Sequence, residues 1–508
     1  MFDVLGFTWL HKLYMLHIIS QASPGFTCSI LFFQSSTARD GLHTILVINK
    51  SLTVSFVPDA WKCSLITPIP KIDNPIGPDD FRPINNLPIF EKILEQIAYE
   101  QIMFYLDENS ILCEQQAGFR KCQSTESLIQ SVLYDWMDAI EGKKKIISVF
   151  LDFRRAFETV SRKILLVKMR RYGFGEKAIK WFESFLSNRK QQTKVNNVIS
   201  EEVYGNHGLP QGSKLANLLF ILYINDLPSH LQNVKTNLYA DDSLIYVCGS
   251  NLDEMANVLR DELNVVGDWL KYNSMALNHK KCNVMFLNVK NERLPQIKID
   301  NECIEHASCV KYLGVWIDCK LSFDIHYQKL KSKINQRTGM LRRLNSKMTK
   351  RSKEIYLKSL ILPLYDYCSS ILMMLDKCQV CEIQKCINRA IRIVLSRARN
   401  DHVSPMLAEL KVLPVSERIK LNAMRFIRTT ISRRLPMSLF RRFSTRAEAR
   451  ARNLRSDEDT ALPHWNISKF RKSIFYEGAK LFNECKKRFR IDEYFLFNCK
   501  IYIVSLNN

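Results

Sequence analysis

Adjacent aspartates in the middle of the chain combine the residue type and spacing that divalent-metal chemistry requires. Asp241 and Asp242 lie between two apolar arms in the stretch TNLYADDSLIYV. Neighbouring carboxylates repel each other, and a bound cation removes that repulsion. Mg²⁺ prefers hard oxygen ligands and takes one or two carboxylates together with phosphate groups. The pair is a weak motif by itself, and an ordinary polar turn is the alternative interpretation.

Asp152 is a third acid of the same kind, because it ends the apolar run ISVFLD. A carboxylate at a strand end and a carboxylate pair at a hairpin tip can meet at one edge of a sheet. Such a cluster fits two metal ions about 3.5–4 Å apart, as in two-metal phosphoryl chemistry. For Asp152 alone, a helix N-cap is the alternative.

The acids need a sheet to position them, and the surrounding pattern predicts one. Apolar runs bounded by turn residues predict strands at 65–69 and 146–151, a hairpin around the aspartate pair, and further strands in CNVMFLNV and VKYLGVWI. Apolar periodicity predicts a helix from Pro88, one capped near Ser124, a helix-like stretch at 162–188, an apolar helix that Ser213 can cap, and mostly basic helices from His326. This mixed order indicates an α+β fold with an antiparallel sheet.

The bulk composition points to an anionic partner. The chain has 508 residues, more than one core usually holds, so we expect two or three subdomains. Its 74 Lys and Arg exceed its 51 Asp and Glu, and the net charge of +23 favours nucleic acid as the partner, with a generally solvated basic surface as the alternative.

The 15 scattered cysteines indicate reduced thiols. Cys378, Cys381 and Cys386 suggest zinc only weakly, because no fourth ligand follows and the segment has a helical pattern.

Eight blocks follow one another from about Asn49 to Asp318, namely ITPIPK, FRPINNL, QAGFRKCQST, VFLDFRRAF, GLPQGSKLANLLFILYINDL, YADD, LNHKKCNVMFL and YLGVWID. In their sequence and order, these blocks resemble the reverse transcriptases of non-LTR (LINE-type) retrotransposons. The resemblance implies a right-hand polymerase fold of the α+β class, with fingers, an antiparallel-sheet palm and a helical thumb. It also implies RNA-directed DNA synthesis with two Mg²⁺ ions, or Mn²⁺ as a substitute. The implied partners are an RNA template, a DNA primer and deoxynucleoside triphosphates.

The resemblance implies a catalytic role for four residues. Asp152 and Asp241 correspond to metal ligands, and Asp242 to the accompanying acid, structural or weakly liganding. Lys281 aligns with a lysine that protonates the leaving pyrophosphate, although the neighbouring Lys280 leaves that alignment open by one position. The block YLGVWID corresponds to the hairpin that holds the primer 3′ end, with an ordinary core hairpin as the alternative.

Five further residues match positions that contact the incoming nucleotide. The ring of Phe157 would clash with a ribonucleotide 2′-hydroxyl, and plain core packing is its alternative. Lys71 and Arg82 match residues of the fingers that contact the triphosphate, and ordinary surface charges are their alternative. Gln211 and Gly212 match positions near the nucleotide and the template. Without the resemblance, their block is a loop-to-helix turn.

The chain departs from the family pattern at two places. Glu158 stands where the family usually has Asp, which keeps the carboxylate on a longer side chain. Ala216 and Asn217 stand where it commonly has Ser-Pro. Neither change touches the metal acids, but both leave room for reduced activity.

Cations follow the sheet region in two runs. The first predicts a helical thumb that contacts the template–primer backbone, with a solvated helix face as the alternative. Its candidate nucleic-acid contacts are Lys331, Lys333, Arg337, Arg342, Arg343 and Lys347. The second run, 433–455, is interpreted as an RNA-binding arm, a nuclear-import signal or a connector.

The blocks and the basic runs define the expected domains. We expect an unassigned segment at 1–48, fingers and palm at 49–318, a basic thumb-like domain at 319–427 and a basic C-terminal segment at 428–508. The stretch before ITPIPK is too short for the endonuclease of full-length elements. The apolar start lacks the features of a signal peptide or a membrane span. We therefore expect a nucleoprotein of the nucleus or cytoplasm, neither secreted nor in a membrane.

Two other interpretations stay open. A catalytically inactive relic would keep the fold and act only as an RNA- or DNA-binding protein. The three aspartates favour an active enzyme, whereas the missing endonuclease and Glu158 favour the relic. A group II intron maturase has a similar palm, but YLGVWID and INRAIRIVL fit the LINE-type pattern better.

Overall fold

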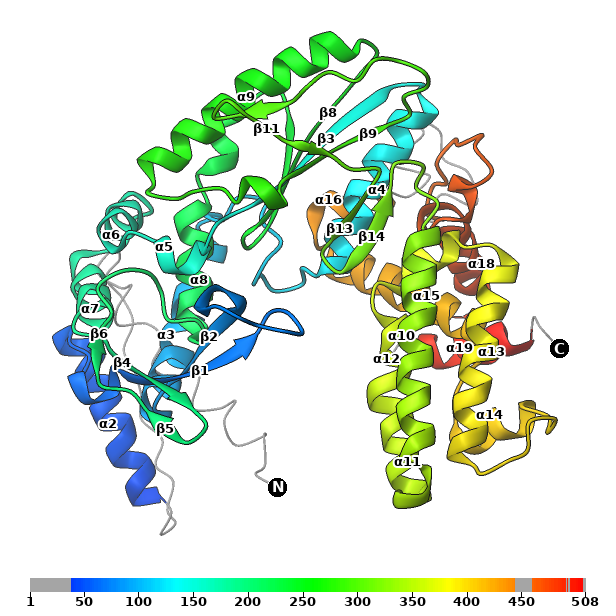
Figure 1. Cartoon of the computed structure of the whole chain (residues 1–508), viewed down its shortest axis with the longest axis horizontal. Coiled ribbons are helices and arrows are strands. Elements are labelled where there is room, and N and C mark those ends of the chain that lie inside the picture. Colours follow the sequence, from blue (N-terminus) through cyan, green and yellow to red (C-terminus); the bar gives the residue numbers. More distant parts are fainter. Residues whose placement is uncertain (1–37, 444–458, 490, 492–493, 506–508) are drawn as a thin grey trace. The chain divides into compact units, whose positions relative to one another are not determined.

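The computed structural model describes residues 38–443, 459–489, 491 and 494–505, and these fall into two compact units (Figure 1). The units are interleaved along the sequence. Unit 1 takes the chain up to Phe119 and then 152–232 and 262–279. Unit 2 takes 120–151, 233–261 and the chain from Lys280 onward.

Unit 1 contains a small mixed sheet in the order β2-β1-β4-β5, with β6 also paired to β4. Its strands are β1 Cys63–Pro70, β2 Phe81–Asn86, β4 Lys190–Val195, β5 Val198–Ile199 and β6 Val203–Tyr204. The strand expected at 65–69 is therefore confirmed as the centre of β1. β1 runs antiparallel to β2 and parallel to β4, which lies more than 100 residues further along the chain.

Unit 1 also contains several helices. They are α2 Ala38–Val54, α3 Ile89–Glu108, α5 Ala156–Thr159, α6 Arg162–Arg171, α7 Glu176–Leu186, α8 Lys214–Ile224 and the second half of α9 Leu252–Tyr272. Pro88 precedes α3 as expected, and the hydroxyl of Ser213 caps α8 by accepting from the Ala216 amide at 3.0 Å. Nine of the eleven residues of α8 are buried, so this helix forms the centre of the unit.

The stretch expected to be helical at 162–188 differs from the prediction, because it forms two helices, α6 and α7. Gly173, between them, has φ +85°, a left-handed conformation that ends a helix and that glycine adopts without strain. The apolar periodicity on either side gave no sign of this break.

A buried ion pair lies in the core of unit 1. Glu91 of α3 is fully buried, and its carboxylate lies 2.7 Å from the guanidinium of Arg189, which is also buried. Loss of hydration outweighs the attraction of Arg189 and raises the pKa of Glu91 to about 7. Each charge depends on the other, because removal of one partner would leave an uncompensated buried charge.

This raised pKa makes the stability of the protein depend on pH. An unfolded Glu ionises near 4.5, so between about pH 4.5 and 7 the folded form binds more protons than the unfolded form. The free energy of unfolding should therefore fall by about 3 kcal/mol as the pH rises through this range. Glu91→Gln, which cannot ionise, should flatten the change in thermal unfolding midpoint between about pH 5 and pH 8. Glu108→Gln, at an exposed position of the same helix, is the control, and an equal flattening there would contradict the assignment to Glu91.

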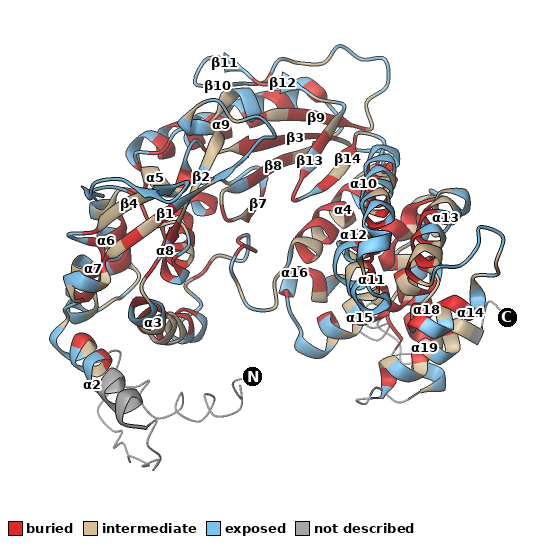
Figure 2. Ribbon diagram, turned by 60° about the horizontal axis from the view of Figure 1, so that its bottom comes forward, coloured by how far each residue is buried: buried red, intermediate tan, exposed pale blue. Residues whose placement is uncertain are grey.

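Unit 2 contains a five-stranded sheet in the order β12-β9-β3-β8-β7. Its strands are β3 Lys145–Asp152, β7 Lys235–Tyr239, β8 Asp242–Gly249, β9 Asn283–Leu287 and β12 Glu305–His306. β3 is antiparallel to β9, and β7 is antiparallel to β8, as expected for the predicted sheet. Figure 2 shows that buried residues run along β3, β8 and β9.

A separate hairpin of β13 Cys309–Tyr312 and β14 Val315–Asp318 follows this sheet. Leu313 and Gly314 both have positive φ, as a two-residue turn of this type requires. The carboxylate of Asp318 then accepts backbone N–H bonds from Lys320, Ser322 and Phe323. These bonds fix the path of the chain from the hairpin into the next helix.

The rest of unit 2 is mostly helical, as expected for the chain from His326 onward. Its α-helices are α4 Thr125–Glu141, α10 Asp324–Arg343, α11 Lys350–Tyr356, α12 Pro363–Asp366, α13 Lys377–Val394, α14 Ser404–Leu410, α15 Val415–Arg433, α16 Met437–Phe440, α18 Ala479–Arg488 and α19 Phe495–Ser505. Ser124 caps α4, as predicted. Within the described ranges, no helix is long and apolar enough to cross a membrane. The mixture of sheet and helix confirms the α+β class.

Candidate active site

The adjacent aspartates lie at the tip of the β7–β8 hairpin in unit 2. Tyr239 pairs with Asp242, so Ala240 and Asp241 form the turn and Asp242 begins β8. Ala240 is buried and has φ +54°. A left-handed conformation costs a residue with a side chain about 1–2 kcal/mol. Strain of this kind is held by the surrounding structure and is found most often at functional sites.

Asp152 is the last residue of β3, which the sheet places next to β8. The six residues before it are buried. Its backbone carbonyl accepts a hydrogen bond from the Asn278 amide at 2.8 Å. The acid therefore ends a strand, and the helix that follows begins after Arg155, so the N-cap alternative for Asp152 is wrong.

The β13–β14 hairpin packs close to the aspartates of unit 2. Tyr312 of β13 is buried, and its ring meets that of Phe150 on β3 at 5.4 Å in an edge-on contact. Burial, and to a smaller extent the carboxylate of Asp242, raises the pKa of Tyr312. A neutral phenol thus lies beside the turn, which is compatible with the predicted primer-holding role.

A chain of polar contacts in unit 1 links two of the residues predicted to contact the nucleotide. The ammonium of Lys71 donates to the backbone carbonyl of Asp79 at 2.8 Å, and the Asp79 carboxylate forms an ion pair with Arg155. Arg155 also lies 3.8 Å from the carboxylate of Glu158. Gln211 donates to Glu158 at 3.4 Å. The longer acid at position 158 therefore still reaches the block that contains Gln211.

Phe157 and Arg82 belong to the same unit. The ring of Phe157 is partly exposed and stacks on that of Phe220 of α8, with centroids 4.6 Å apart. Arg82 is exposed on β2, where its backbone is opposite Ile69. Core packing against Phe220 thus accounts for part of the Phe157 ring, and its sugar-excluding role stays a prediction.

Gly212 is required by a close approach of two backbones. It has φ +113°, and a Cβ on it would lie 2.6 Å from the carbonyl oxygen of Asn85. Asn85 holds the same turn with two hydrogen bonds to the Gln211 carbonyl, from its backbone amide at 2.7 Å and from its side-chain amide at 3.1 Å. The Ser64 hydroxyl donates to the Asn85 side chain at 2.8 Å and fixes its orientation.

Glu95 holds the other side of this turn. It is buried on α3 and accepts hydrogen bonds from the Ser213 hydroxyl at 2.6 Å and from the Lys214 amide at 2.8 Å. Neither Asn85 nor Glu95 was predicted from the sequence. A signal for Glu95 was present, because it falls among apolar residues on the buried side of α3, where an unpaired acid would be costly.

Lys281 is exposed in the short 3₁₀ helix His279–Lys281 that precedes β9. Asn283, two residues later, pairs with Phe150, and Asp152 lies two residues after Phe150. Beyond this pair the register changes, because the Asn278 amide donates to the Asp152 carbonyl and Phe153 pairs with Leu277, so the choice between Lys281 and Lys280 stays a prediction. Among the described residues, no group of three or more His, Cys, Asp or Glu is arranged to hold a metal ion.

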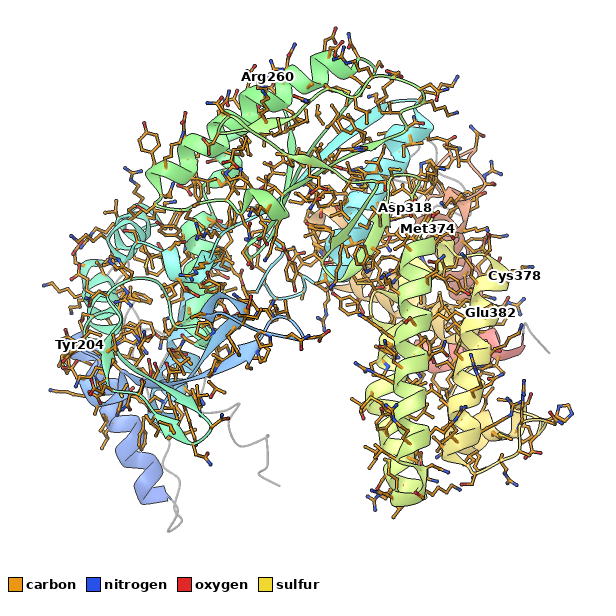
Figure 3. The ribbon with its side chains drawn as sticks, in the orientation of Figure 1. Tyr204, Arg260, Asp318, Met374, Cys378 and Glu382 are labelled. Atoms are coloured by element: carbon orange, nitrogen blue, oxygen red, sulfur yellow. The ribbon has the colours of Figure 1, made fainter. Side chains whose placement is uncertain are left out.

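The cations of the first basic run occupy different environments. Lys331 of α10 forms an ion pair at 2.9 Å with Glu382 of α13, which is labelled in Figure 3, and Arg337 donates to the backbone carbonyl of Leu360. Four others are exposed, namely Lys333, Arg342, Arg343 and Lys347. Nucleic-acid contact at Lys331 and Arg337 would therefore compete with protein contacts, whereas no ion pair within the described ranges engages these four.

The remaining cysteine and arginine predictions fall on α13 and the C-terminal region. Cys378 and Cys381 are exposed on α13, whereas Cys386 is buried, so the three do not share a surface. Arg442 of the second basic run forms an ion pair with Asp135. The part of that run at 444–455, which includes Arg446 and Arg450, lies outside the described residues.

The reverse transcriptase (RNA-dependent DNA polymerase) family matches residues 69–317. These residues are a reverse transcriptase domain. The domain contains every predicted metal acid and nucleotide-contacting residue, and it confirms the polymerase-type α+β fold expected from the sequence.

Relatives of this reverse transcriptase domain come from non-LTR retrotransposons, which confirms the family resemblance of the eight blocks. The probable RNA-directed DNA polymerase from transposon BS of Drosophila melanogaster is 27% identical over 398 residues, 76% of this chain and 44% of that protein. The RNA-directed DNA polymerase from the mobile element jockey of the same species is 29% identical over 290 residues, 55% of this chain and 31% of that protein. The chain thus spans less than half the length of either relative. Among solved structures, the apo telomerase from Candida tropicalis is 12% identical, with a TM-score of 0.40 over 82% of this chain and 74% of that one.

Proposed function

We propose that the protein is an RNA-directed DNA polymerase that extends a primer 3′ end with deoxynucleotides by a two-metal mechanism. One observation carries this proposal. Asp152 ends β3, Asp241 lies in the turn between β7 and β8, and Asp242 begins β8. β3 and β8 are neighbours in the sheet. Carboxylates on neighbouring strands would provide the hard oxygen donors that this chemistry uses.

The proposed metal ligands are Asp152 and Asp241, with Asp242 as the accompanying acid. Mg²⁺ binds one or two carboxylates and completes its coordination with phosphate and water, so this donor set suits it, and Mn²⁺ is a substitute. Two bound ions would activate the primer 3′-hydroxyl and stabilise the leaving pyrophosphate. The left-handed Ala240 keeps the two acids of the hairpin in a fixed position relative to β8.

The other predicted residues of the reverse transcriptase domain would bind and orient the nucleotide. Lys71 and Arg82 would contact the triphosphate, because a guanidinium binds phosphate oxygens through two donors. Gln211, fixed through its backbone by Asn85, would contact the nascent base pair. Lys281 would deliver a proton to the leaving pyrophosphate, as a general acid does.

Substrate nucleic acid would contact exposed cations. We assign the fingers and palm to 49–318 and the thumb to 319–427. Template and primer phosphates would be bound by exposed cations of α10 and of the short 3₁₀ helix Asn345–Lys347 that follows it. Lys333, Arg342, Arg343 and Lys347 are the exposed cations in this set. Binding that depends on several phosphate contacts should weaken steeply with salt.

Primer extension on an RNA template tests the proposal. Purified protein is incubated with an annealed DNA primer, deoxynucleotides and Mg²⁺, and Asp152→Asn is measured in parallel. Extension that is lost in the variant supports the polymerase. Salt-sensitive RNA binding without extension would instead support the inactive, binding-only alternative.

The stacked position of Phe157 gives a second prediction. Phe157→Ala should lower the preference for deoxynucleotides over ribonucleotides by roughly tenfold or more, because it opens space for the 2′-hydroxyl. The ratio of kcat/KM for the two nucleotides is the measurement. Phe157→Tyr, which keeps the ring, is the control, and a preference unchanged in Phe157→Ala would remove the sugar-excluding role.

A further inference from the structure

A pocket outside the candidate active site lies between α6 and the second half of α9 in unit 1. Its volume is about 670 Å³, which lies within the range of small-molecule sites and is large enough for a nucleotide. On α6, Lys163, Val167 and Arg171 are spaced four residues apart and therefore share one face. Both cations on this face are exposed. The pocket thus has a wall with two positive charges on either side of an apolar residue.

The acids in the pocket are already engaged. Asp226 accepts from the ammonium of Lys168 at 2.7 Å, and Asp268 lies 3.6 Å from Lys271. In the part of the chain that the structure describes, neither Lys163 nor Arg171 has an acidic partner within ion-pair distance. The pocket therefore has an unbalanced positive charge, which an anionic ligand would neutralise.

The opposite wall of the pocket is aromatic. Tyr272, at the end of α9, is 83% exposed, which is unusual for so large a ring. Trp269, one turn earlier, is buried, and its indole N–H has no acceptor among the described residues. An exposed ring beside free cations is the combination with which proteins bind single-stranded nucleic acid, by stacking the bases and neutralising the phosphates.

The pocket is separate from the candidate nucleotide site. The block with Gln211 and Gly212 precedes the first residue of α8, whereas Lys168, in the pocket, donates to the carbonyl of Tyr223 at the other end of that helix at 2.7 Å. A helix of eleven residues is about 16 Å long. A ligand in the pocket would therefore not occupy the position of the incoming nucleotide.

We propose that this pocket binds a segment of single-stranded RNA, with a base stacked on Tyr272 and phosphates bound by Lys163 and Arg171. This inference rests on the proposed function in one respect, that RNA is the polymer the protein handles. It adds a second RNA contact that operates while the template–primer occupies the polymerase site.

Fluorescence anisotropy with a short labelled single-stranded oligoribonucleotide tests the proposal. The protein is first saturated with unlabelled template–primer duplex. Lys163→Glu combined with Arg171→Glu should weaken binding of the labelled strand and lower the slope of log K against log salt by about 1.4, the value for two lost single-strand phosphate contacts. Tyr272→Ala should weaken it roughly tenfold, and Tyr272→Phe should restore it.

Lys177→Glu combined with Lys180→Glu is the matched control, because it makes the same charge change on α7 of the same unit. Equal weakening in this control, or an unchanged slope in the α6 variant, would overturn the proposal. Equal loss of template–primer affinity in the α6 variant would also overturn it, since the effect would then be general electrostatics. Failure of the polymerase itself is measured separately by primer extension, whereas strand binding does not require catalysis.

Discussion

Asp241→Asn should reduce primer extension by roughly 10³-fold or more and leave RNA affinity within about twofold. Asparagine keeps the size of the side chain but removes the charge that a divalent ion needs. Asp241 lies in the turn of the β7–β8 hairpin, and the cations expected to bind phosphate lie on other elements. Single-turnover extension and RNA binding, measured on the same preparation, check both parts of this expectation.

Asp261→Asn provides the control, because Asp261 is exposed on α9 and the charge change is the same. It should alter neither extension nor binding. Equal losses of extension and RNA affinity in Asp241→Asn would count against a metal-ligand role and indicate a folding defect instead. Full extension by that variant would exclude Asp241 as an essential ligand.

The second large effect is expected from Gly212→Ala. The new Cβ would lie 2.6 Å from the Asn85 carbonyl oxygen, and φ +113° is a conformation that residues with side chains rarely adopt. The turn must therefore move and carry Gln211 with it. A misplacement of about 1 Å at such a site costs about 10²-fold, so we expect that decrease in kcat/KM for the deoxynucleotide.

Gly77→Ala separates this effect from a general sensitivity to substitution. Gly77 is in the same unit, has φ −114°, and would place its Cβ in open space. It should keep the wild-type kcat/KM, as measured by steady-state extension at varied nucleotide concentration. If Gly212→Ala behaved in the same way, the close approach to Asn85 would have no part in positioning Gln211.

Local sequence signals were sufficient for most elements of the sheet and its flanking helices. Buried runs such as 146–151 predicted strands, and Ser124 and Ser213 marked helix starts because their hydroxyls satisfy free backbone amides. The aspartate hairpin was also predictable, since two apolar arms flank a short polar tip. Each of these signals lies within a few residues of the feature it predicts.

Features that depend on distant residues were not predictable in this way. The parallel pairing of β1 with β4 joins segments more than 100 residues apart. α2 begins at Ala38, in a region without clear periodicity. Lys331, predicted only as a phosphate contact, is paired with Glu382, which belongs to another helix. A single sequence shows the charges but not which of them meet.

The residues of the candidate site also fall into predictable and unpredictable groups. The motif residues carry recognisable chemistry, so their types and order identified them. Asn85 and Glu95, which hold the turn of Gln211 and Gly212, act through contacts that span more than 100 residues. Their roles follow from hydrogen-bond geometry, which the linear pattern does not contain.

The burial of α8 has a consequence for how the gene can change. Nine of its eleven positions are enclosed on all sides, so most substitutions there would create a cavity or bury a polar group at a cost of about 1–5 kcal/mol. One end of the helix adjoins the Gln211 block and the other adjoins the α6–α9 pocket. In a saturation-mutagenesis library selected for extension, we therefore expect α8 to be among the least tolerant segments, while the exposed positions of α9 accept most replacements. Mutational tolerance along this one helix would thus measure how strongly selection for synthesis acts on the chain.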